Sequence, residues 1–219
     1  MDRIRSNRRV QIDESQEPKY DVAEDGAEGN GMRLRLSDIN VTEDQEPFMG
    51  VKVRRRASLH RDYKGDYIDV ASHPYLMKIL QKQGDKQVVF ADKVLKFTGS
   101  GKMKRRILLI TDFAIYILDP ETDALKRRIS LAAVEKMCLS ELSDNFFAII
   151  IPTEYDILMA STRKTEIVTV LVEATKSASG EVEVAFSNSF EYQASAELTK
   201  EVQFEEVEGL WAVELIVNK

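Results

Sequence analysis

Residues that build disulfides and metal centres are scarce in this 219-residue sequence. The single cysteine, Cys138, excludes an intramolecular disulfide and a cysteine-based metal cluster, and the two histidines, His60 and His73, have no partners at metal-binding spacing. No run approaches the roughly 18 consecutive apolar residues of a membrane-spanning helix. The polar, arginine-rich first residues also lack the apolar core of a secretory signal. We therefore expect a soluble, intracellular protein that holds no metal or other cofactor.

Motifs of the common enzyme classes are also missing. The sequence contains no Gly-x-Ser-x-Gly, no Walker loop, no His-Glu-x-x-His and no Cys-x-x-Cys. Residues 98–102 (TGSGK) faintly resemble a phosphate loop, but that motif's first glycine is absent. These residues also connect two expected strands, whereas a phosphate loop opens a helix whose N-terminus faces the anion. The sequence therefore favours a binding module over an enzyme.

A marked separation of charge is present instead. The net charge is +3 over residues 1–9, −8 over 10–50, +6 over 51–179 and −7 over 180–219, within a total of −6. A basic middle between acidic flanks indicates an anionic partner for the middle of the chain.

Residues 1–50 and 51–219 differ in composition. The first segment is acidic, poor in aromatic residues and contains clustered glycines, which predicts a disordered tail. A short patch, Met32–Leu36, alternates like a strand and is able to dock on the body. Residues 51–219 are expected to form one folded domain.

Two helices and about nine short strands are expected in the folded part. One helix is predicted over residues 72–83, between Ser72 as N-cap and Gly84 as stop, and a longer one over residues 162–178. Strands are expected at residues 88–95, 107–110, 113–118, 125–139 (one or two strands), 146–151, 155–160, 182–186, 190–193, 202–207 and 210–217. The closely spaced turn signals favour an antiparallel meander. The predicted class is α+β, mainly β: a strongly bent sheet, a sandwich or a partly open barrel.

The segment 93–106 is the strongest candidate for a binding site. It surrounds the tip of an expected hairpin and contains six basic residues and no acidic one: Lys93, Lys96, Lys102, Lys104, Arg105 and Arg106. Alternate residues of a strand share a face, so Lys96, Lys104 and Arg106 are able to point the same way. Several cations converging in this manner suit several phosphates. The alternative is a solvated basic loop without a ligand.

Four segments, in this order, resemble the tail homology 1 domain of class I myosins: residues 54–67, 104–111, 125–131 and 139–147. The resemblance covers about residues 52–219. It implies a pleckstrin-homology-like fold, with one long helix and a short preceding helix, that binds phosphoinositides and other anionic lipids. The family's lipid motif is a lysine in the first strand followed by Lys/Arg-x-Arg in the second, which here falls on Lys96 and on Lys104 with Arg106. Residues 1–50 contain no motor and no calmodulin-binding IQ pattern, so no link to actin or a motor is carried over.

The predicted function is peripheral attachment to the inner face of cytoplasmic membranes through phosphoinositides or other anionic phospholipids. The alternative is a pleckstrin-homology-like scaffold module whose basic hairpin binds an acidic protein partner. Binding of nucleic acid is not expected, because Phe97 is the only aromatic residue among the basic ones.

A secondary basic patch precedes the folded part, and it contains a candidate phosphorylation site, Ser58. The patch consists of Arg54, Arg55, Arg56 and Arg61. Arginines two and three residues before Ser58 form a pattern that basic-directed kinases recognise. A phosphate would add roughly −1.5 to −2 charge and release the protein from an anionic membrane roughly 30-fold. Vesicle binding of phosphorylated and unmodified protein tests this hypothesis.

Overall fold

The computed structural model describes residues 31–35, 63–85, 87–142, 144–178, 180–207 and 210–217, and the side chains of residues 63–85, 87–142, 144–178 and 180–205. The secondary basic patch and Ser58 lie outside the described residues, as does most of segment 1–50.

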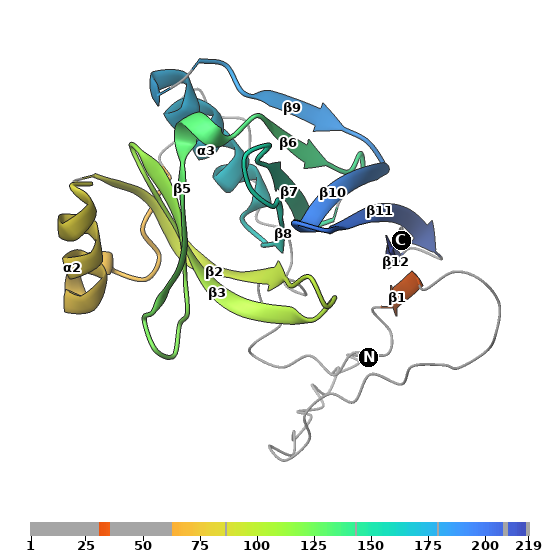
Figure 1. Cartoon of the computed structure of the whole chain (residues 1–219), viewed down its shortest axis with the longest axis horizontal. Helices are drawn as coiled ribbons and strands as arrows, with labels where there is room; N and C mark the ends of the chain where they lie inside the picture. Colours follow the sequence, from red (N-terminus) through yellow and green to blue (C-terminus); the bar gives the residue numbers. More distant parts are fainter. Residues whose placement is uncertain are drawn as a thin grey trace, which may run out of the picture.

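An eight-stranded, strongly bent sheet forms the body of the molecule (Figure 1). Its spatial order is β5-β4-β3-β2-β8-β7-β6-β9. The strands are β2 (Val88–Phe97), β3 (Met103–Thr111), β4 (Ala114–Leu118), β5 (Leu125–Ser130), β6 (Lys136–Leu139), β7 (Phe146–Ile150), β8 (Ile157–Ala160) and β9 (Glu183–Phe186). Among the described residues, β5 and β9 form no ladder with each other, so the sheet curls without closing. The predicted α+β, partly open barrel is confirmed.

The connection to β9 departs from the expected antiparallel meander. All pairs from β5 to β6 are antiparallel, but β6 and β9 run parallel, with Met137 opposite Val184. The long helix α3 (Lys164–Ala178) lies between β8 and β9 in the chain. A helix supplies the crossover that a parallel pair requires, and closely spaced turns alone do not reveal it.

A second, four-stranded sheet has the order β1-β12-β11-β10. It contains β1 (Gly31–Arg35), β10 (Ser189–Ser195), β11 (Leu198–Val207) and β12 (Leu210–Val217). Strand β1 comes from the segment expected to be a tail, and it pairs antiparallel with β12 from Gly31 opposite Ile216 to Arg35 opposite Ala212. The alternating patch at Met32–Leu36 therefore includes most of a real strand.

Both predicted helices are present, but the N-cap of the first is His73 and not the predicted Ser72, which belongs to a preceding 3-10 turn (Val70–Ser72). Helix α2 (Pro74–Gln83) ends at Gly84, whose φ of 82° is a left-handed conformation that glycine adopts without strain. Its buried residues, Leu76 and Leu80, pack on the outer face of the large sheet. Helix α3 buries Ile167 and Leu171 against the concave face instead.

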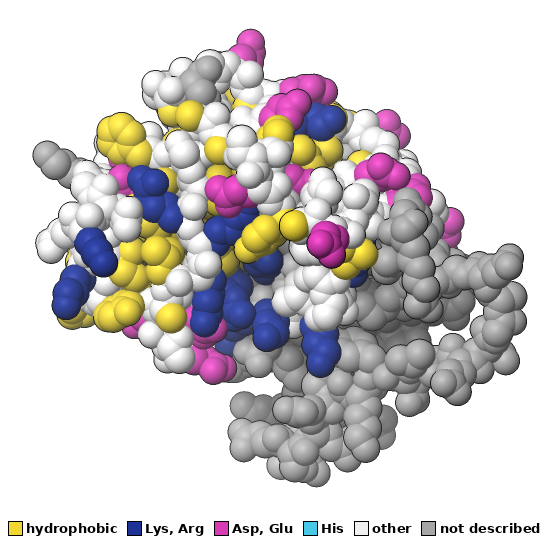
Figure 2. Space-filling view, in the orientation of Figure 1, with side chains coloured by type: hydrophobic (Ala, Val, Ile, Leu, Met, Phe, Trp, Pro, Cys, Tyr) yellow, Lys and Arg dark blue, Asp and Glu magenta, His cyan; other side chains and the backbone are white. Residues whose placement is uncertain are grey.

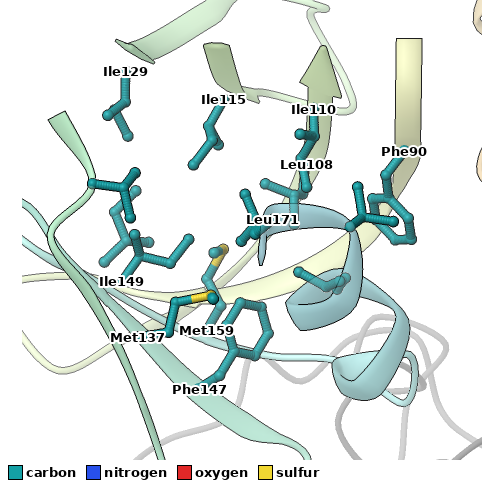
Figure 3. Packing of buried hydrophobic residues seen from close by; sticks show 14 of the residues in the cluster. Phe90, Leu108, Ile110, Ile115, Ile129, Met137, Phe147, Ile149, Met159 and Leu171 are labelled. Carbon is teal, nitrogen blue, oxygen red and sulfur yellow. The ribbon is translucent and has the colours of Figure 1, made fainter. Parts of the chain in front are cut away.

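The main core lies inside the bend of the large sheet (Figure 3). Phe90, Leu108, Ile115, Phe147 and Leu171 converge there and are almost completely buried. The outer face carries two smaller clusters, one beneath α2 and one beneath the small sheet. In the described residues, no helix is long and apolar enough to cross a bilayer.

Candidate functional site

The register of the β2–β3 hairpin brings three of the predicted basic residues onto one face. Lys96 lies directly opposite Lys104, and Arg106 lies opposite Val94. Directly opposed residues of an antiparallel pair point to the same side, and Val94 belongs to the main core. Lys96, Lys104 and Arg106 therefore extend the concave face beyond the apolar core, toward the hairpin tip. Their predicted common direction follows from this register.

The other three basic residues of the segment do not join them. Lys93 and Arg105 alternate with the residues of the concave face and therefore lie on the outer side of the hairpin. Lys102 is exposed in the turn, where its carbonyl oxygen accepts hydrogen bonds from the amide nitrogen (2.9 Å) and the hydroxyl group (3.0 Å) of Thr98. The turn itself depends on Gly101, whose φ is 82°. Residues 98–102 are thus a strand-to-strand turn, as expected.

Arg106 is held by an acidic neighbour. Its Nη1 lies 3.3 Å from Oδ2 of Asp119, which follows β4, and the Nζ of Lys126 lies 3.6 Å from the same oxygen. Nη1 also donates to the carbonyl oxygen of Arg105 at 2.7 Å. The Arg106 side chain is only 17% exposed, so its guanidinium is fixed at the side of the concave face.

Lys96 is a half-buried cation of the hairpin. Its Nζ donates to the carbonyl oxygen of Phe97 at 3.3 Å. Burial, followed by the positive charges of Arg127 and Arg106, lowers the pKa of this amine to about 8. Lys104, directly opposite, is exposed and adds a third cation to this end of the face. Like charges placed opposite each other are unfavourable, and a bound anion would relieve that repulsion.

Arg127, on β5, is a further basic residue at this position that was not among the predicted site residues. It lies opposite Ile117 and shares the concave face with Ile129, and its side chain is only 7% exposed. The sequence did contain a signal for Arg127. It alternates with inward-facing apolar residues of its strand, and an inward-facing position normally carries an apolar side chain. We call the end of the concave face bounded by Lys96, Lys104, Arg106 and Arg127 the basic mouth.

Figure 2 shows the charge on this side of the molecule. Lys and Arg side chains gather in the middle of the face, over the region where Figure 1 places the β2–β3 hairpin. Acidic side chains are more scattered and lie mainly toward the edges of this view. On this face, part of the basic middle of the sequence therefore forms a cluster of cations.

Gly65 and Tyr67 contact the first turn of α3. Glu166 accepts hydrogen bonds from the amide of Gly65 at 3.3 Å and from the hydroxyl of Tyr67 at 2.8 Å. The guanidinium of Arg163 stacks 3.6 Å from the centre of the Tyr67 ring and donates to Oδ2 of Asp92 at 2.9 Å. These contacts hold Gly65 and Tyr67 against the start of α3.

Comparison with known proteins identifies the family of this chain. Residues 54–214 match the family described as "Unconventional myosin tail, actin- and lipid-binding". The chain is 33% identical to the myosin ID heavy chain of Dictyostelium discoideum over 151 residues, which cover 63% of this chain and 13% of that protein. It is 34% identical to myosin heavy chain IB of Acanthamoeba castellanii over 169 residues, which cover 73% of this chain and 15% of that protein.

A third relative, the myosin IB heavy chain of Dictyostelium discoideum, is 33% identical over 169 residues, which cover 74% of this chain and 15% of that protein. The chain thus spans only 13% to 15% of these relatives, and the matched part is their tail. The family match and these identities lead to one conclusion: the chain belongs to the tail homology 1 family of class I myosins.

Proposed function

We propose that this tail domain attaches reversibly to membranes by binding phosphoinositides and other anionic phospholipids in the basic mouth. Lipid binding in general is a property for which the family is described, and the matched region is a tail and not a catalytic motor. The observation that carries the finer proposal is the cross-strand pair of Lys96 and Lys104, beside Arg106, on one face. Phosphorylated headgroups present several negative charges to several fixed cations there.

The expected strength is that of a peripheral module. Each basic residue near an anionic leaflet contributes about 1 kcal/mol. Three engaged cations thus raise the affinity roughly 150-fold. Attachment of this strength is reversible and depends on salt, because exposed charges are screened within a Debye length of about 8 Å at physiological ionic strength.

Substitution of the hairpin cations tests the proposal. We expect the double variant Lys96→Ala/Arg106→Ala to bind vesicles of phosphatidylcholine and phosphatidylinositol bisphosphate at least about tenfold more weakly than the unmodified protein, since two cations are lost. Lys93→Ala/Arg105→Ala is the matched control, because it removes the same number of charges from the opposite face of the same hairpin. Sedimentation measures binding, and thermal unfolding verifies that both variants fold. Equal binding by the double variant and the control would refute the site.

The same experiment distinguishes membrane binding from the alternative function, binding of an acidic protein partner. A scaffold module that binds an acidic protein through this surface would not sediment with phosphoinositide-containing vesicles. The family description includes actin as well as lipid, so both classes of partner belong in the assay. Retention of lipid binding by the unmodified protein and its loss in the double variant would favour the membrane.

A further inference from the structure

Strand β9 carries an exposed aromatic side chain at the edge of the large sheet. Among the described residues, β9 pairs with β6 alone (Figure 1). Val182, just before the strand, and Val184 pack against the main core, and Phe186 follows them on the same face, because side chains alternate along a strand. Phe186 is nonetheless 63% exposed. Proteins usually protect a free sheet edge with charged residues, and an exposed apolar side chain there makes the edge available to another strand.

The backbone of β9 presents hydrogen-bonding groups along this edge. The amide of Ser187, which follows the strand, donates to the carbonyl oxygen of Leu139 on β6 at 2.8 Å. Because backbone groups alternate in direction along a strand, the amides and carbonyls of Val184 and Phe186 point away from β6. Within the described part of the chain, these four groups form no hydrogen bond with another strand or loop. They are therefore able to pair with an added strand.

A groove of about 350 Å³ adjoins the exposed ring. It lies between the first half of α3 and the ends of β6 and β9, and Phe186, Val168 and Leu142 contribute its apolar surface. The side chain of Lys164 also lines the groove, but its amine donates to Oδ1 of Asp144 at 3.1 Å, so its charge is already compensated. A small, largely apolar groove of this kind suits one aliphatic or aromatic side chain.

Acidic residues surround the groove. Residues 181–199 contain four glutamates and no lysine or arginine. Glu141 lines the groove just after β6, and Glu183 begins β9; both side chains are exposed. Lys136 lies opposite Glu183, whereas no ion pair among the described residues involves Glu141. Figure 2 shows acidic side chains over the part of the molecule where Figure 1 places β9. This charge favours a basic partner and disfavours edge-to-edge pairing of two copies of this chain.

We propose that the edge of β9 and the adjoining groove bind an extended, basic segment of a partner protein, which adds a strand to the large sheet. The backbone groups of Val184 and Phe186 pair with this segment, and the groove receives one of its apolar side chains. Lysine or arginine residues on either side face Glu141 and Glu183. In strand addition the main-chain hydrogen bonds supply affinity, whereas the groove and the charges select the sequence. The proposal gives the acidic segment after α3 a role that membrane binding does not explain.

Selection from a library of random short peptides, with the whole chain as the target, tests the proposal. We expect the enriched peptides to combine an aliphatic or aromatic residue with flanking lysine or arginine. Phe186→Ala should weaken binding of a selected peptide about tenfold, measured by fluorescence anisotropy, because the groove loses its phenyl wall. Phe113→Ala is the matched control and should leave binding unchanged, since Phe113 is 56% exposed in the connection between β3 and β4.

Two further measurements separate the contributions of charge and backbone. Glu141→Gln/Glu183→Gln should weaken peptide binding about fivefold, because two exposed charge pairs are lost. N-methylation of alternate residues of the peptide removes the amide donors along one of its edges. One of the two alternating patterns should abolish binding and the other should preserve it, since a strand pairs with its neighbour through alternate residues.

Several outcomes would overturn the proposal. These are a library that yields no binding peptide, equal effects of Phe186→Ala and Phe113→Ala, and enrichment of acidic peptides, which would indicate the basic mouth instead. A dimer in sedimentation velocity that Phe186→Ala dissociates would show that a second copy occupies the edge. Should Phe186→Ala not fold, Glu141→Gln/Glu183→Gln still tests the surface, because both glutamates are exposed. Phe186→Ala should leave vesicle binding unchanged, so failure of this inference is distinguishable from failure of the proposed function.

Discussion

Because the amine of Lys96 is half-buried, we predict that affinity for anionic vesicles depends on pH. Its pKa is lowered to about 8, chiefly by burial and then by Arg127 and Arg106. The charged form is present below that value and is lost above it. About nine-tenths of these amines are protonated at pH 7, and about one-tenth at pH 9. Affinity for anionic vesicles should therefore fall as the pH rises through this range.

The size of the fall follows from the charge that is lost. One cation near an anionic surface contributes about 1 kcal/mol, so complete deprotonation of Lys96 should weaken binding about fivefold. A bound phosphate favours the protonated amine, which moves the midpoint of the fall to pH 8 or above. For the same reason, binding near pH 8 should be accompanied by proton uptake.

The assay is a vesicle titration from pH 7 to pH 9.5, combined with calorimetry in buffers of different ionisation enthalpy. The lipid also titrates, so each measurement is compared with Lys96→Arg, which stays charged over the whole range. The ratio of the two affinities should change with pH. In Lys104→Arg, the unmodified Lys96 should preserve the pH dependence of the parent protein. A constant ratio between the parent and Lys96→Arg would refute the assignment of Lys96 as a titrating ligand-binding residue.

Two further predictions concern stability. The Lys164 amine donates to Oδ1 of Asp144 at 3.1 Å, and the two side chains are 4% and 0% exposed. Lys164→Met should leave the buried carboxylate without an ion-pair partner. We therefore expect it to lower the free energy of unfolding, measured by urea titration, by about 3 kcal/mol or more. Lys176→Met, which breaks an exposed pair with Glu181, should change it by less than about 1 kcal/mol; equal effects would contradict the argument. A Cβ on Gly65, where φ is 74°, would lie 2.8 Å from the carbonyl oxygen of Val89, whereas nothing lies within 4 Å at Gly84. Gly65→Ala should therefore lower the unfolding temperature more than Gly84→Ala. At Gly84 the only cost is that of placing alanine in a left-handed backbone conformation, roughly 1–2 kcal/mol. A larger effect of Gly84→Ala would contradict this argument.

Much of the fold could be predicted because its signals are local. The apolar spacing over residues 72–83 and 162–178 and the stop at Gly84 predicted both helices, and the structure contains them as α2 and α3. The turn at residues 98–102 indicated a hairpin, and strand alternation predicted which of its lysines and arginines share a face. Each of these signals depends on residues only a few positions apart in the chain.

Pairings between distant segments were not accessible in this way. The parallel alignment of β9 with β6 depends on the path of α3, and the position of β1 depends on its partner β12, which is far away in the sequence. The alternation at Met32–Leu36 indicated a strand but not its partner. Periodicity describes which face of a strand is apolar, and it contains no information about which other strand lies beside it.

The sequence by itself determined most of the helices and strands, the charge segregation and the family, because periodicity, helix stop signals and motif order are properties of the linear sequence. Only the tertiary structure decided the composition of the basic mouth. It separated Lys93 and Arg105 from the three hairpin cations of the concave face, and it added Arg127 and Tyr155 from strands and connections outside the motif. The physical reason is the curvature of the sheet. Bending brings Arg127 of β5 and Lys96 of β2 near the ring of Tyr155 although two strands lie between β5 and β2, and no local pattern specifies how strongly a sheet bends.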